Sequence, residues 1–79
     1  MVQAVWNLEI GLIGDEERGH SIIGRLHEQR NVSVEHGAFW MVTYLDLPTV
    51  EAALQQLATD LDRIDAGWRE VLTIGQVRS

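Results

Sequence analysis

Residues 2–15 read VQAVWNLEIGLIGD, and this stretch contains the first strand and the entry to the first helix. Along residues 2–13 every second side chain is apolar, which is typical of a strand with one buried face. Gly14 ends this strand, and Asp15 can cap a helix whose first turn carries two glutamates at the positive end of its dipole. The stretch therefore predicts a strand that runs directly into a helix.

The rest of the chain continues with the same two kinds of pattern. Apolar residues at helical spacing predict two helices, the second of them capped by Thr49, and period-two alternation predicts three further strands. A tight turn at His36–Gly37 joins two of the strands. The predicted strands cover residues 2–13, 31–35, 38–47 and 68–77, and the predicted helices cover residues 16–30 and 50–64.

The order of these elements is strand, helix, strand, strand, helix, strand, which is typical of a ferredoxin-like α+β fold. Right-handed crossovers place both helices on one face of a four-stranded antiparallel sheet, with the first and third strands at its centre. We expect one domain over residues 1–79, with the other face of the sheet open.

Composition narrows the classes of function. The 79 residues carry a net charge of −6 and no cysteine, and all six basic residues are arginine, which argues against nucleic-acid binding and excludes disulfides and thiolate metal sites. No stretch approaches the roughly 20 apolar residues of a membrane span, and no basic segment typical of a signal peptide precedes the first strand. We expect a cytoplasmic protein with no metal and no cofactor, whose small core favours a partner chain.

The third predicted strand is apolar on both faces, which indicates an interface. If Asp46 points to solvent, alternation places three large side chains on the open face of the sheet, together with a valine from the first strand. We expect self-association through this surface, with a protein partner, a ligand held between two sheets, or an exposed apolar cluster without a function as alternatives. The predicted interface residues are Val5, Trp40, Val42 and Tyr44.

The segment from Leu12 to Val34 resembles the ACT domains, in which a strand runs into Asp-x-x-Gly, an apolar helix follows, and Asn-Ile opens the next strand. Here the corresponding residues are Asp15, Gly19 and Asn31-Val32, with the loop one residue longer and Arg18 where the family usually has proline. The stretch from residue 46 to 52 is also similar to the family's entry to its second helix.

This resemblance implies a regulatory module that binds an amino acid or a similar small ligand, commonly as a pair of domains. Carried over by position, Asp15, Gly19 and Asn31 would line the ligand site, and we add His20 because it lies beside Gly19. Backbone N–H groups at a helix start can bind a carboxylate, while an acid and an amide can bind an ammonium group. Asp15 as a simple cap and Asn31 as a simple turn residue remain the alternative.

Two other classes of protein, RNA-recognition motifs and dimeric α/β-barrel enzymes, have the same order of elements as the ACT domains. Residues 38–44 loosely resemble the third-strand motif of RNA-recognition motifs, but the negative charge and the absence of lysine argue against RNA. A dimeric α/β-barrel enzyme could use Trp6, His27 or Tyr44 without a recognisable motif. His20 and His27 are about 10 Å apart along a helix, too far to share one metal ion.

We therefore predict a small non-catalytic regulatory or ligand-binding module that acts as a homo-oligomer. The alternatives are a dimeric α/β-barrel enzyme and a protein-interaction module that uses the apolar sheet face. The acids of the second helix are expected on its solvent side; they are Asp60, Asp62 and Asp65.

Overall fold

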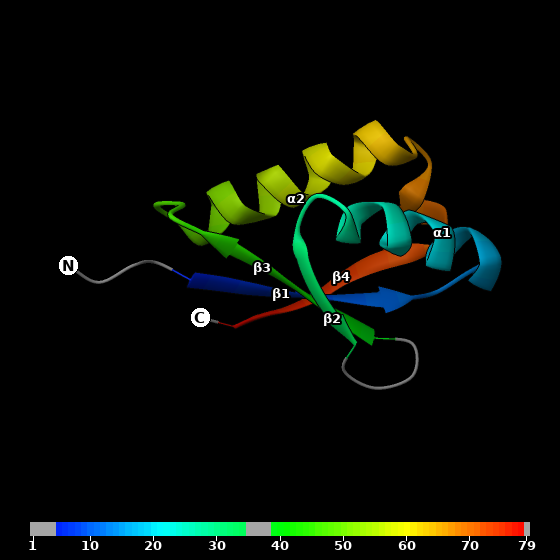
Figure 1. Cartoon of the computed structure of the whole chain (residues 1–79), viewed down its shortest axis with the longest axis horizontal. Coiled ribbons are helices and arrows are strands. Elements are labelled where there is room, and N and C mark those ends of the chain that lie inside the picture. The colour runs from blue at the N-terminus through cyan, green and yellow to red at the C-terminus, as the bar shows by residue number, and fades with distance from the viewer. Residues whose placement is uncertain (1–4, 35–38, 79) are drawn as a thin grey trace.

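The computed structural model describes residues 5–34 and 39–78, and these form a four-stranded antiparallel sheet with two helices on one face (Figure 1). The strand order is β2-β3-β1-β4, so the first and third strands are central as predicted, and the fold is ferredoxin-like α+β. Residues 2–4 and the predicted turn at His36–Gly37 lie outside the described residues. The elements are β1 (Val5–Leu12), α1 (Glu16–His27), β2 (Asn31–Val34), β3 (Phe39–Leu45), α2 (Val50–Ile64), the 3₁₀ helix η1 (Trp68–Glu70) and β4 (Leu72–Arg78).

Both helices begin at the predicted caps. The Asp15 carboxylate accepts a hydrogen bond from the Arg18 backbone N–H at 3.2 Å, and the Thr49 hydroxyl accepts one from the Ala52 N–H at 3.1 Å. Each cap satisfies a backbone donor that the first helical turn leaves unpaired. Within residues 5–34 and 39–78, no helix combines the length and the apolar character that crossing a membrane requires.

The predicted start of the last strand, at residue 68, is wrong. Residues 68–70 form a 3₁₀ turn, in which the Trp68 N–H donates to Asp65 and the Val71 N–H donates to Trp68. The Trp68 side chain is buried, and its indole N–H donates to Asp62 at 2.8 Å. The apolar alternation of this segment therefore reflects a buried turn rather than a strand, and β4 begins only at Leu72.

The predicted orientation of the third strand is also wrong. Trp40, Val42 and Tyr44 face the helices and are buried, with at most 4% of each residue exposed, so they belong to the core and not to an open interface. The error came from Asp46, which lies beyond the end of β3 and has a φ of 63°. Strand alternation does not continue through a residue in the left-handed region, so its side chain carries no information about the faces of β3.

The open face of the sheet instead carries the alternate residues of β1 and β3. Val5 is paired with Leu45 at one end of this face, and Phe39 is paired with Gly11 at the other. Val5, Phe39 and Leu45 are each more than a third exposed. Of the predicted interface residues, Val5 alone lies on this face.

Candidate ligand-binding site

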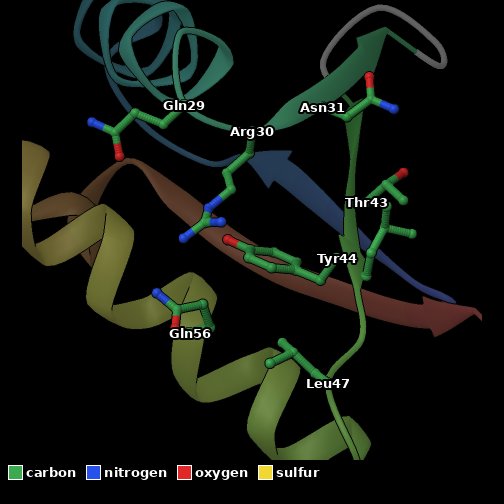
Figure 2. Close-up of a pocket in the computed structure, with 8 residues that line it drawn as sticks. Gln29, Arg30, Asn31, Thr43, Tyr44, Leu47 and Gln56 are labelled. Carbon is green, nitrogen blue, oxygen red and sulfur yellow. The ribbon is translucent and has the colours of Figure 1, made fainter. Parts of the chain in front are cut away.

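A hollow of about 280 Å³ lies where β2 begins, between the end of α1, the end of β3 and the first half of α2 (Figure 2). The segment after α1 contributes adjacent side chains to it, because the chain turns there from the helix into β2. Apolar and polar groups both line the hollow, which is the usual composition of a small-molecule site. The lining residues are Gln29, Arg30, Asn31, Thr43, Tyr44, Leu45, Leu47 and Gln56.

The main charged group of the hollow is the Arg30 guanidinium. Its Nε donates to one carboxylate oxygen of Asp60 at 2.8 Å, and its Nη2 donates to the other at 3.3 Å. The guanidinium carbon also lies 5.2 Å from the centre of the Tyr44 ring, within the range of a cation–π contact. Arg30 is thus held by the ion pair along one edge and by its contact with the Tyr44 ring.

Asp60 is the buried partner that fixes this arrangement. It is 1% exposed and also accepts hydrogen bonds from the Tyr44 hydroxyl at 2.8 Å and from the Gln56 amide at 3.0 Å. Burial alone would raise the pKa of Asp60, but the hydrogen bonds from Arg30, Tyr44 and Gln56 together outweigh it and hold that pKa below its ordinary value. Asp60 is therefore a carboxylate at neutral pH, and the prediction that it lies on the solvent side of the second helix is wrong.

The same surroundings make Tyr44 a poor candidate for proton transfer. Burial, followed by the hydrogen bond to the Asp60 carboxylate, raises the pKa of the Tyr44 phenol well above its ordinary value. The hydrogen bond to Asp60 likewise raises the pKa of Arg30. These groups can bind and orient a molecule, but they are held in fixed protonation states at neutral pH.

The side chains of the hollow project to two sides of β3. Figure 2 shows the Arg30 guanidinium beside the hydroxyl end of Tyr44, with the Gln56 amide facing it from α2. Asn31 and Thr43 project to the other side of the strand, where the Thr43 hydroxyl donates to the Asn7 side chain at 2.9 Å. The charged part of the hollow is thus the side nearer α2, and Asn31 lies at its rim.

The four residues of the predicted ligand site do not lie close together within one chain. Asp15 and Gly19 lie in the first turns of α1, whereas Asn31 follows its last turn, and a 12-residue helix is about 18 Å long. Asp15 serves as the helix cap, and His20 is exposed with its ring edge-on to Trp40, at a centroid distance of 5.3 Å. Only Asn31 lines the hollow.

Gly19 has a packing role. It is buried, and a Cβ at this position would collide with the side chain of Leu12 from β1. The glycine therefore allows α1 to approach the sheet closely.

The N-terminal end of α1 is tied to the far end of α2 through Arg18. Its guanidinium donates twice to Asp65, at 2.8 Å each, and once to Glu70 at 3.1 Å. The hydrogen bonds from Arg18, then the one from the Gly67 N–H, lower the pKa of Asp65 to about 2. The residue that replaces the proline of the ACT pattern thus makes a structural ion pair.

Sequence reasoning missed Arg30, Gln56 and Asp60. A signal for Asp60 was present, because it falls on the same helical stripe as Leu57, Leu61 and Ile64, at steps of three and four residues. Its position within an apolar stripe, rather than the acids around it, indicates a buried carboxylate that needs a cationic partner. No comparable signal pointed to Arg30: it was predicted as the last residue of a helix over residues 16–30, but α1 ends at His27 and Arg30 lies in the turn that follows.

A second hollow, of about 360 Å³, lies beside β4. Arg69 covers the ring of Trp68 there, at 4.3 Å from the ring centre, and Ile13 is 60% exposed. Arg69 also pairs with Asp62 at 3.6 Å. This hollow lacks the convergent polar groups of the first one, so we take the hollow at Arg30 as the candidate site.

Comparison of the chain with protein-family models, curated proteins and solved structures finds no significant match. Function is therefore inferred from the geometry of this chain.

Proposed function

We propose that the chain is a small non-catalytic ligand-binding module, with its site in the hollow at Arg30 rather than at the start of α1. The observation that carries this proposal is a guanidinium held by a buried carboxylate at the wall of a hollow within one chain. The size of the hollow, about 280 Å³, suits an amino acid or a metabolite of similar size. The ACT-like pattern of α1 and β2 is consistent with a regulatory role for such binding.

The test is a thermal-shift screen against the common amino acids and simple carboxylates. A ligand present at 100 times its dissociation constant adds about 2.7 kcal/mol to the free energy of unfolding. In a domain of this size, that raises the melting temperature by roughly 10–20 °C, at about 4–8 °C per kcal/mol. A flat screen over these compounds would contradict the proposal.

Two matched variants place the site. Asn31→Ala removes a polar group from the rim of the hollow and is expected to reduce the ligand-induced shift. Asp15→Ala removes a helix cap, which lowers stability by about 1 kcal/mol but should leave the ligand-induced shift unchanged. The opposite pattern would return the site to the start of α1.

We propose as a second candidate that the open sheet face mediates self-association. Val5, Phe39 and Leu45 leave apolar surface at both ends of this face. Between them, the hydrogen bond from Thr43 to Asn7 already pairs two polar groups, so burial of the face would not leave these two atoms unsatisfied. This candidate is compatible with ligand binding, because the Arg30 guanidinium lies on the side of β3 nearer α2.

Light scattering on the variants Phe39→Glu and Leu45→Glu tests the second candidate. If the wild type is a dimer through this face, either variant should give the monomer mass of 8.9 kDa. Gln55→Glu adds the same charge on the exposed side of α2 and should leave the mass unchanged. A monomeric wild type, or an assembly that survives both sheet variants, would contradict this candidate.

A further inference from the structure

We propose that Arg30 binds the carboxylate of a small aliphatic acid whose tail lies against Leu47. This inference rests on the proposed function and names the chemical class of its ligand.

The guanidinium is fixed before any ligand arrives. Asp60 takes the edge formed by Nε and Nη2, and the guanidinium carbon lies over the Tyr44 ring, 5.2 Å from its centre. Asp60 is itself fixed by hydrogen bonds from Tyr44 and Gln56. A ligand that binds to Arg30 therefore does not have to immobilise a free arginine side chain, which lowers the entropic cost of binding.

The pair with Asp60 leaves a second edge of the guanidinium. Nη1 lies outside the ion pair, and the Arg30 side chain is 36% exposed. An arginine side chain carries five N–H donors in a plane, and Nη1 and Nη2 together can present two parallel donors to a carboxylate. The fixed edge toward Asp60 thus orients the free edge for a planar anion.

The charge around the hollow favours one carboxylate. Apart from Arg30, the lining contains only amides, hydroxyls and apolar groups, in a chain whose net charge is −6. The Asp60 carboxylate already balances the single charge of Arg30, so the site offers N–H donors rather than a net positive charge, and a singly charged carboxylate is easier to place there than a dianion. A phosphate dianion would need further cationic or backbone donors, which the lining side chains do not supply.

The walls of the hollow favour a short aliphatic tail. Leu47 packs against the core with part of its surface uncovered, and Figure 2 shows it on the side nearer α2, with Tyr44 and Gln56. A branched tail of a few carbons would cover this side chain. An α-amino group is compatible with the same pose, because a glutamine side-chain oxygen can accept its hydrogen bond.

Isothermal titration calorimetry with two matched pairs of compounds tests this inference: isocaproate against isocaproamide, and L-leucine against L-leucinamide. Each pair differs in the carboxylate and keeps the tail. We expect each acid to bind, and its amide to bind at least about ten-fold more weakly, because the amide lacks the hydrogen-bonded charge of the acid.

Variants of Arg30 link the effect to this side chain. Arg30→Gln should abolish binding of the acids, whereas Arg18→Gln, which removes an arginine ion pair at the other end of α1, should leave binding unchanged. Because Arg30→Gln also leaves Asp60 without its cation, Arg30→Lys is the second variant. This variant keeps a positive charge opposite Asp60 but lacks the planar guanidinium. The acids should therefore bind to it roughly ten-fold more weakly than to the wild type.

The outcomes separate this inference from the proposed function. Equal binding of acid and amide, or acid binding that survives Arg30→Gln, would overturn the carboxylate inference and leave the hollow as a ligand site. If only a neutral compound stabilises the protein, and Asn31→Ala reduces that stabilisation, the carboxylate inference is also overturned and the hollow remains a ligand site. If none of the four compounds binds and no compound in the wider thermal-shift screen raises the melting temperature, both proposals are overturned.

Discussion

At the scale of single residues, Asp60 joins three elements through one buried carboxylate. It accepts hydrogen bonds from Arg30 before β2, from Tyr44 on β3 and from Gln56 on α2. Replacement of one member of a buried ion pair leaves the other members without partners, and this costs more than the pair itself contributes. The candidate ligand site therefore depends on a residue that no ligand would touch.

Asp60→Ala is expected to lower the free energy of unfolding by about 3 kcal/mol, at the low end of the range for buried pairs because Arg30 can reach water. Tyr44→Phe removes only one hydrogen bond to the carboxylate and should cost about 1 kcal/mol. Urea unfolding followed by tryptophan fluorescence measures both.

The matched control is Glu51→Gln, an exposed acid in the first turn of α2, which should change stability by less than about 0.5 kcal/mol. An Asp60→Ala variant as stable as this control would show that Asp60 does not hold the three elements together.

Acid sensitivity is a second expectation at this scale. The pKa of Asp65 in the folded chain is about 2, below its ordinary value of 3.8, so the unfolded chain binds this proton more readily. The stabilising contribution of Asp65 is therefore complete above about pH 4 and is lost as the pH falls toward 2. The lowered pKa of Asp60 acts in the same direction.

Urea unfolding of the wild type and of Asp65→Asn across this acidic range measures the effect. The difference in stability between the two proteins should shrink as the pH falls from about 4 to about 2. A difference that stays constant or grows would mean that the ion pair with Arg18 does not form in solution.

The faces of individual side chains were the least predictable feature. Strand β3 is apolar on both sides, so its alternation alone could not decide between Trp40 and Phe39 as core residues. What decides it is a tertiary contact: the Tyr44 hydroxyl needs a partner, and Asp60 on α2 supplies one. The candidate site was missed for the same reason, since Arg30 and Asp60 are 30 residues apart in sequence.

At the scale of elements, the sequence predicted the order and type of all four strands and both helices. The junctions with clear local chemistry, Asp15 and Thr49, were predicted to the residue. The junction at Trp68 was missed, because a buried 3₁₀ turn and the start of a strand have similar apolar spacing over three residues. Local caps are readable from sequence, whereas burial by a neighbouring element is not.

Replacement by alanine is predicted to have opposite effects on stability at Gly24, inside α1, and at Gly14, between β1 and α1. A Cβ at Gly24 in α1 would meet nothing within 4 Å, so Gly24→Ala should stabilise the protein by about 0.5–1 kcal/mol through helix propensity. At Gly14 a Cβ would lie 2.6 Å from the Glu70 carbonyl oxygen, so Gly14→Ala should destabilise it by about 1–3 kcal/mol.

Melting temperatures of the two variants check this pair, and each serves as the control for the other. If Gly14→Ala were as stable as the wild type, the close approach of the β1–α1 junction to the chain before β4 would be wrong.

At the scale of the whole molecule, the two faces of the sheet have separate roles. The helix-covered face holds the core and the Arg30–Asp60 pair, and the open face carries the exposed apolar residues Val5, Phe39 and Leu45. Ligand binding and self-association can therefore be varied independently. We expect Phe39→Glu to leave the affinity for isocaproate unchanged, as measured by the same titration; a loss of affinity would mean that the site requires a second chain.

The binding of a small carboxylate at Arg30 can be tested by mapping chemical-shift changes onto the structure. Uniformly ¹⁵N-labelled protein would be titrated with isocaproate while backbone and side-chain N–H signals are followed. We expect the largest shifts on the Arg30 Nε–H, the Gln56 side-chain amide and the backbone of residues 44–47. Shifts centred on residues 15–20 or on the open sheet face, or no shifts at all, would contradict carboxylate binding at Arg30.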